Sequence, residues 1–198
     1  MECTTNELTA NFLLFNELAD NIKRPGTDKL LEWVDSTDYY IAPASTNQHD
    51  SETGGLLKHS LNVTNIMLSL EHKIPAKIPV ESIYVCGLFH DLCKVNSYKI
   101  ETRWRKNSDA QWEEYDKWVF NEDLKYGAHG AKSVYLLQNF IHLTPEEASA
   151  INAHMGAWDK SVYSNPGAVY SWNPLAWLLH VADEFDTYRG GWQHILQS

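Results

Sequence analysis

Six histidine and aspartate side chains recur along this sequence in segments whose apolar residues have helical spacing. They are His59, the adjacent pair His90 and Asp91, His129, His154 and Asp183. Imidazole and carboxylate groups that are buried in a helical core lose their hydration, which is unfavourable unless a partner replaces it. A divalent metal ion is the simplest partner for so many lone pairs. The sequence therefore predicts a metal-dependent enzyme.

The donor atoms of this set restrict the metal. Nitrogen and oxygen ligands suit Mn, Fe, Co, Ni or Zn better than a site built for soft metals. Adjacent residues of a helix point about 100° apart, so His90 and Asp91 can both reach a metal only where other helices converge, near the mouth of a bundle. An aspartate can also bridge two metals through its two oxygens. One ion and two ions are both compatible with the spacing.

The elements that must position these side chains are mostly helices. His59 is followed by apolar residues at i+4, i+7 and i+11, so it falls on the inward stripe of its helix. A change to strand alternation predicts a β-hairpin insertion at about 97–120. Helices are predicted at 5–19, 27–36, 56–72, 80–94, 127–141, 145–154 and 174–188, and a loop at 156–173. We expect one mostly α-helical domain over residues 1–198.

The chain is acidic. Its 198 residues include 16 Lys and Arg against 26 Asp and Glu, which gives a formal net charge of −10. An acidic surface repels a long phosphate backbone, so binding of long nucleic acid is disfavoured, whereas a small anionic substrate can bind beside a metal. The N-terminus lacks a basic start with a long apolar run, and no stretch reaches the roughly 20 apolar residues of a membrane span. We expect a cytoplasmic protein that does not bind membranes.

The cysteines indicate free thiols. Cys3, Cys86 and Cys93 are odd in number and form no CxxC pair. Cys86 and Cys93 fall in one predicted apolar helix, so both are expected to be buried and reduced, as in a reducing compartment.

Five segments, in this order, resemble the motifs of the HD-domain metal-dependent phosphohydrolases. They are GGLLKHSL (54–61), LFHDLCK (88–94), GAHGAKSV (127–134), INAHMG (151–156) and LLHVAD (178–183). The resemblance covers about residues 54–188 and is closest to the HD module of bacterial 3′-to-5′ exoribonucleases and of small phage or bacterial HD hydrolases. It implies an HD-type helical bundle that carries the inserted hairpin.

The resemblance also implies a role for each candidate ligand. One metal would be held by His59, His90, Asp91 and Asp183. His129 and His154 would hold a second metal bridged by Asp91, or would bind substrate phosphate if only one metal is present. Many two-metal members have two consecutive histidines at the fourth motif, where this chain has His154 followed by Met155. The number of metals therefore stays open.

Several further residues are candidates for contact with the phosphate. Lys94, one helical turn after His90, and Asp91 are the predicted catalytic residues. Arg103 and Arg105 share one face of the predicted hairpin, where they either clamp a phosphate or lie on a solvated edge. Lys132 and Ser133, beside His129, are weaker candidates for substrate contact, His180 is expected in the core, and Asp186 is expected at the surface or as a helix cap.

Taken together, these residues predict a phosphohydrolase that uses a metal-activated water on a nucleotide or a related small phosphate ester. Two alternatives remain. One is a phosphodiesterase or 3′-to-5′ exonuclease that acts on short oligonucleotides or cyclic nucleotides. The other is a non-catalytic sensor that binds a metal or a nucleotide on the HD scaffold. The sequence also leaves open whether identical chains associate, because aromatic residues such as Trp112 and Trp118 are candidates for a dimer surface.

Overall fold

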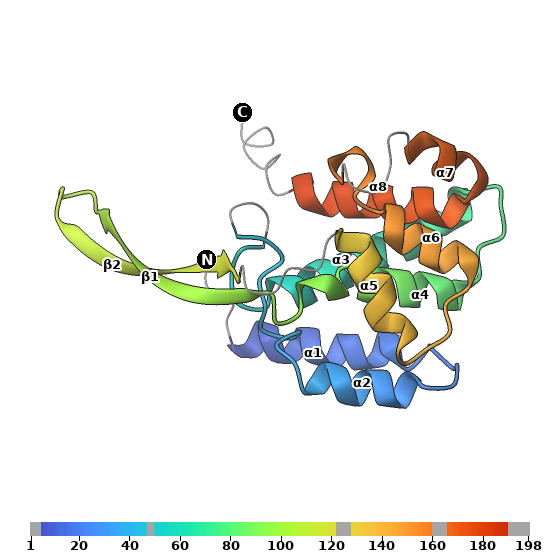
Figure 1. Cartoon of the computed structure of the whole chain (residues 1–198), viewed down its shortest axis with the longest axis horizontal. Helices are drawn as coiled ribbons and strands as arrows, with labels where there is room; N and C mark the ends of the chain where they lie inside the picture. Colours follow the sequence, from blue (N-terminus) through green and yellow to red (C-terminus); the bar gives the residue numbers. More distant parts are fainter. Residues whose placement is uncertain (1–4, 47–49, 122–127, 160–165, 190–198) are drawn as a thin grey trace.

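The computed structural model describes residues 5–46, 50–121, 128–159 and 166–189. It is a bundle of α-helices from which one two-stranded hairpin projects (Figure 1). The predicted fold class is confirmed. The helices are α1 (Thr5–Ala19), α2 (Thr27–Asp35), α3 (Gly55–Leu70), α4 (Val80–Phe89), α5 (His129–Gln138), α6 (Pro145–Ala153), α7 (Pro166–Trp172) and α8 (Pro174–Arg189), with 3-10 turns at Glu71–Lys73, Leu92–Lys94 and Gly156–Trp158.

Helix α3 is central to the bundle and packs against both α4 and α8. Its inward face carries Leu57, Val63 and Met67, which have no exposed surface. Burial of each such side chain stabilises the fold by about 1.5–3 kcal/mol. The close approach of α4 depends on Gly87, because a Cβ there would lie 2.4 Å from the hydroxyl oxygen of Thr64. This close packing lets side chains of α3 and of the end of α4 meet.

The segment between α1 and α2 is tied to α6 by a buried ion pair. Arg24 donates to both carboxylate oxygens of Glu147, at 2.8 and 2.9 Å. The side chain of Glu147 is fully buried and that of Arg24 is 15% exposed. Glu147 also closes a capping box with Thr144 at the start of α6. One carboxylate therefore both begins α6 and holds the N-terminal helices against it.

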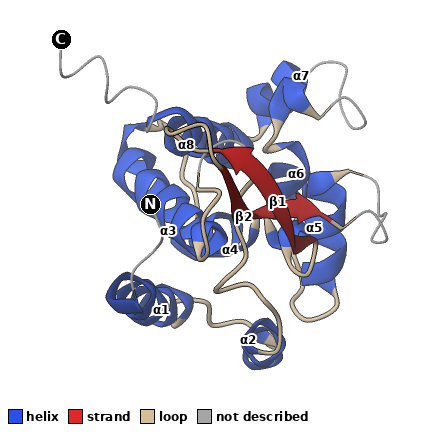
Figure 2. Cartoon of the chain, turned by 90° about the vertical axis from the view of Figure 1, so that its left-hand side faces the viewer, coloured by secondary structure: helices blue, strands red, loops and turns tan. Residues whose placement is uncertain are grey.

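The predicted hairpin is present. Strand β1 (Tyr98–Lys106) pairs antiparallel with β2 (Trp112–Phe120) over their full lengths. The two strands extend away from the helices, and Figure 2 shows them end-on in front of the bundle. At the base, the backbone N–H of Asn121 donates to the carbonyl of Ser97 at 2.8 Å, so the chain leaves and returns at one point.

Two predicted elements differ clearly from the structure. The helix predicted at 80–94 ends at Phe89, and a 3-10 turn follows. Cys86 and Cys93 are buried and free, as predicted, but this break places Cys93 outside α4. The predicted loop at 156–173 contains α7, whose seven residues are too few to display a helical repeat. Within the described residues, no helix combines the length and apolar character needed to cross a membrane.

Candidate metal centre

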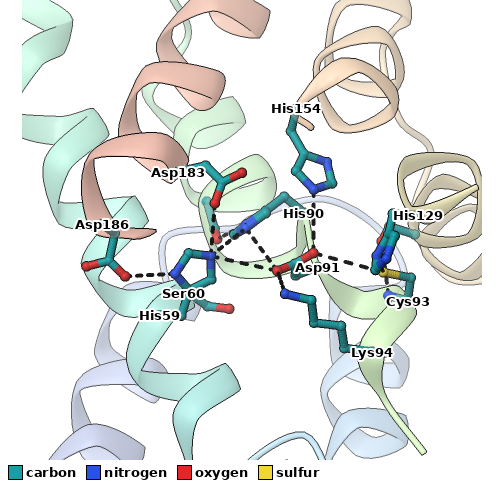
Figure 3. A network of polar contacts seen from close by, with 12 residues as sticks. His59, Ser60, His90, Asp91, Cys93, Lys94, His129, His154, Asp183 and Asp186 are labelled. Atoms are coloured by element: carbon teal, nitrogen blue, oxygen red, sulfur yellow. Dashed lines mark hydrogen bonds and ion pairs between the residues drawn. The ribbon is translucent and has the colours of Figure 1, made fainter. Parts of the chain in front are cut away.

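Side chains from four parts of the bundle converge in its interior (Figure 3). His59 comes from α3 and Asp183 from α8. His154 follows the last residue of α6, and the pair His90 and Asp91 follows α4. The three histidines have no exposed surface, and the two aspartates are 2% and 7% exposed.

The break at the end of α4 allows both members of the His-Asp pair to face the same point. In a continuous helix the two side chains would diverge by about 100°. His90 instead caps α4, and Asp91 adopts φ −100° and ψ 20°, outside helical geometry. The predicted convergence at the mouth of a bundle is therefore achieved by ending the helix, which the apolar pattern through Leu92 did not indicate.

The ligand atoms lie at the spacing of a coordination shell. His59 Nε2 is 3.1 Å from Asp183 Oδ1 and 3.3 Å from His90 Nε2. Asp91 Oδ2 is 3.7 Å from His59 Nε2 and 3.6 Å from His90 Nε2. When four ligand atoms surround one ion at bonds of about 2.0–2.2 Å, neighbouring ligands are separated by roughly 3.3–3.6 Å.

Backbone hydrogen bonds orient two of the imidazoles. His90 Nδ1 lies 3.0 Å from the carbonyl oxygen of Gly87, and His154 Nδ1 lies 2.7 Å from that of Ile151. A carbonyl only accepts, so both Nδ1 atoms carry a proton, and in the neutral ring each Nε2 directs a lone pair inward. Burial would lower the pKa of His154, but Asp91 outweighs it and raises that pKa, so a metal that binds there displaces a proton. His154 Nε2 is buried without a hydrogen-bond partner. An inward lone pair with no donor is the arrangement expected of a metal ligand, so these residues fit a divalent metal.

Asp186 is a part of the site that the sequence analysis placed wrongly. It was expected at the surface or as a cap, but it is 2% exposed and its Oδ2 is 2.7 Å from His59 Nδ1. Its Oδ1 pairs with Arg189 Nε at 2.8 Å. Asp186 lies three residues after Asp183 and so shares its helical face. That spacing was the available signal for its role in orienting His59.

Burial and charge set the protonation of these groups. Burial would lower the pKa of His59, but the carboxylates of Asp183 and Asp186 outweigh it and raise that pKa to about 9. Burial lowers the pKa of His90 to about 4. The pKa of Asp183 is held well below its usual range, because its contact with His59 outweighs burial, which would raise it. In the metal-free protein a proton on His59 thus bridges to Asp183, and metal binding must release it.

Replacing Asp186 by asparagine is expected to weaken metal binding by about 10–100-fold, because the charge that orients His59 and raises its basicity is lost. Calorimetric titration of the metal-free protein with Mn²⁺ measures the effect. Glu32→Gln, at an exposed carboxylate of α2 that is not among the residues lining the pocket, is the matched control and should retain the wild-type affinity. An affinity of Asp186→Asn within twofold of wild type would show that Asp186 does not support the ligand.

Lys94 and His129 flank Asp91 on the other side (Figure 3). Lys94 is 9% exposed, and its Nζ is 2.5 Å from Asp91 Oδ2. It is therefore a buried partner of Asp91 and not a solvated lysine at a helix end. His129, the first residue of α5, is exposed, and its Nδ1 is 3.2 Å from Cys93 Sγ.

The structure groups the remaining histidines differently from the sequence analysis. His129 and His154 were expected to form one pair. His154 instead clusters with His90 and Asp183, and His129 clusters with Asp91 and Cys93, with the ligand atoms of each group within 4.8 Å of one another. His180, expected in the core, is half-buried and its Nδ1 donates to the carbonyl of His154 at 2.7 Å. It holds the end of α6 in place.

The two hairpin arginines are not brought to the cluster. Arg105 Nε pairs with Glu113 at 2.6 Å, and Arg103 pairs with Glu101 at 3.2 Å. All four side chains are exposed, and neither arginine is among the described residues that line the pocket over the cluster. This arrangement is that of the solvated edge hairpin, the other reading of the sequence.

A pocket of about 310 Å³ opens over the cluster. Asp91, Asp183, Lys94 and His129 line it, together with the aromatic side chains of Tyr98, Trp158 and Tyr188. Pockets that bind small molecules enclose about 300–1,000 Å³ and combine apolar walls with a few convergent polar groups. Both the volume and the lining fit a small ligand.

Comparison with known proteins identifies the scaffold. No curated protein and no solved structure matches the chain. The HD domain matches residues 56–188, about two thirds of the chain, and this range contains all six histidines and aspartates from which the metal site was predicted. HD domains are generally metal-dependent hydrolases, which agrees with the ligand cluster. The closer resemblance to the exoribonuclease module stays a prediction. The chain belongs to the HD domain family.

Proposed function

We propose that the chain is a divalent-metal-dependent phosphohydrolase that acts on a nucleotide or a related small phosphate ester. The observation that carries this proposal is the convergence of inward-facing imidazoles and two carboxylates at the floor of a small-molecule pocket. The unpartnered Nε2 of His154 supports a metal there, since a cluster without one leaves a buried lone pair unsatisfied. A bound divalent cation would act as a Lewis acid toward the phosphoryl group and would lower the pKa of a coordinated water.

Protein side chains would supply the remaining chemistry. His59, His90, Asp91 and Asp183 are the proposed first ligand set. The ammonium group of Lys94, in the pocket wall, is positioned to bind a phosphoryl oxygen and to offset negative charge that develops in the transition state. Its ion pair with Asp91 fixes its position before substrate binds.

The aromatic wall favours a nucleotide over a plain sugar phosphate. Tyr98, Trp158 and Tyr188 line the same pocket as Lys94. Trp158 is 67% exposed and Tyr188 is 45% exposed, so their ring faces are available to a ligand. Stacking of a base on such a ring is worth about 1–3 kcal/mol. The net charge of −10 argues against a long polyanion as substrate.

A substrate panel tests the proposal directly. It contains ribo- and deoxyribonucleoside mono-, di- and triphosphates, cyclic nucleotides, short oligonucleotides and ribose 5-phosphate. We expect phosphate release from a nucleotide only after Mn²⁺ or another transition ion is restored to metal-free protein. The stacking energy predicts a kcat/KM about 5–150-fold higher than for ribose 5-phosphate.

Each other outcome has a defined meaning. Turnover of cyclic nucleotides or oligonucleotides alone would contradict the proposed substrate class and would favour the alternative function, a phosphodiesterase. Tight nucleotide binding without turnover under any metal would contradict the proposed enzyme and would favour the non-catalytic sensor. Equal turnover with and without metal would contradict the metal-dependent mechanism itself.

A further inference from the structure

A cysteine completes a second cluster of potential ligands beside the first. Cys93 Sγ is 3.2 Å from His129 Nδ1 and 4.0 Å from Asp91 Oδ1. The three atoms all lie within 4.8 Å of one another. In a tetrahedral site with metal bonds of about 2.0–2.3 Å, neighbouring ligand atoms are roughly 3.3–3.8 Å apart. The observed spacing is close to that of three ligands of a single ion.

Asp91 presents a different oxygen to each cluster. Its Oδ2 lies 3.7 and 3.6 Å from the Nε2 atoms of His59 and His90, whereas its Oδ1 faces Cys93. The same Oδ1 is 3.5 Å from His154 Nε2, which is buried without a hydrogen-bond partner. Figure 3 shows the imidazole of His154 pointing at this oxygen. A lone pair without a donor thus points at the second cluster as well.

The backbone of Cys93 is held on several sides. Its N–H donates to Ser133 Oγ at 3.0 Å, and its carbonyl accepts from Lys132 Nζ at 2.5 Å and from Ser97 Oγ at 2.8 Å. Lys132 and Ser133 were predicted to touch substrate, but neither is among the described residues that line the pocket. Their contacts fix the position of the Cys93 thiol, and ligands held in this way bind metals more tightly.

We propose that Asp91, Cys93 and His129 form a second metal site, which binds a thiophilic ion such as Zn²⁺, Co²⁺ or Fe²⁺ and shares Asp91 with the first site. This inference rests on the proposed function, because Asp91 bridges only if its Oδ2 also binds a metal. On binding, the S–H bond of Cys93 breaks, a sulfur–metal bond forms and the proton passes to solvent. A thiolate ligand favours such ions over Mg²⁺.

The site is accessible from the pocket. His129 is exposed and lines the pocket, so an ion can enter from solvent. Cys93, contributed by the turn after α4, supplies the third donor beside Asp91 and His129.

Titration of the metal-free protein with Co²⁺ tests the proposal by absorption and calorimetry. We expect two bound equivalents and a near-ultraviolet charge-transfer band from a thiolate–cobalt bond. Cys93→Ser should remove the band and weaken one equivalent by more than about 100-fold, since losing even an outer partner of a ligand costs about 10–100-fold. Cys86→Ala is the matched control, because Cys86 is an equally buried thiol within α4, and it should keep both signals.

A second variant guards against a folding defect in Cys93→Ser. His129 is exposed, so His129→Ala should retain the far-ultraviolet circular dichroism of the wild type while losing the band. Two bound equivalents without a band, a band that persists in Cys93→Ser, or a single equivalent would each overturn the second site. None of these three results would contradict metal binding at the first site or the proposed phosphohydrolase activity. Failure to bind any equivalent would instead contradict the proposed function, and the inference with it.

Discussion

Replacing Asp91 by asparagine is expected to lower kcat/KM for the preferred nucleotide by at least about 1,000-fold, or about 4 kcal/mol of transition-state stabilisation. Asp91 is the carboxylate that faces both ligand clusters and also fixes Lys94. Its loss therefore removes a ligand and releases the cation proposed to bind phosphate. The measurement is steady-state hydrolysis with saturating metal, accompanied by calorimetric metal titration of the same preparations.

The control must separate chemistry from stability. Asp91→Asn leaves the ammonium of Lys94 buried without its ionic partner, which destabilises a fold by about 3–5 kcal/mol. The double variant Asp91→Asn with Lys94→Met removes the unpaired charge and should recover stability but not activity. Asp116→Asn, in the exposed part of the hairpin, should retain full activity. A folded Asp91→Asn protein with activity within tenfold of wild type would place catalysis elsewhere.

Replacing Glu147 by glutamine is expected to reduce the free energy of unfolding by about 3 kcal/mol at pH 7, at the lower end of the range for breaking a buried ion pair. Glu147 is fully buried, accepts two hydrogen bonds from Arg24 and caps α6, so one substitution weakens three contacts. Urea denaturation measures the change. The exposed pair of Arg105 and Glu113 is the matched control, since Arg105→Gln should change stability by less than about 1 kcal/mol.

The contribution of Glu147 is also expected to depend on pH. Burial alone would raise the pKa of Glu147, but hydrogen bonds from Arg24 and from the backbone of Thr144 outweigh it and lower the pKa below its usual 4.5. A carboxylate whose pKa falls on folding stabilises the protein fully above the unfolded pKa and progressively less as the pH falls through the folded one. The stability difference between wild type and Glu147→Gln should therefore shrink below about pH 4.5. A difference that stays constant or grows on acidification would contradict the ion-pair explanation.

Much of the architecture was predictable because it follows from local periodicity. The helix around His59, the helix that begins at Pro145 and the alternation of the hairpin are all encoded within short windows of sequence, and the structure has all three. The end of α4 was not predictable in this way. Apolar residues continue through Leu92, yet the helix stops after Phe89, where the His-Asp pair turns toward side chains of other helices.

The limits at the site have the same origin. Sequence motifs named the residues that converge but not which atoms face each other. The contact of Asp186 with His59 joins residues 127 positions apart, and that of Cys93 with His129 joins residues 36 apart. The i,i+3 spacing of Asp183 and Asp186 indicates a shared face of α8, but neither contact partner can be read from a single helix, since both contacts depend on how α3, α5 and α8 are packed. For the hairpin arginines the sequence left a phosphate clamp and a solvated edge open, because a shared strand face was predictable but the direction of the whole hairpin was not.

The closed base of the hairpin has a consequence for how this chain can change over evolutionary time. Because Ser97 and Asn121 meet at one hydrogen bond, the residues between them form an excursion that returns to its starting point. Lengthening such a loop has a small entropic cost of closure, about 0.6 kcal/mol for each doubling of its length. The excursion also lies between Cys93 and His129 in the chain without separating them in space. Beyond Tyr98, which lines the pocket, the hairpin can therefore be lengthened or replaced over evolutionary time without displacing the ligand residues.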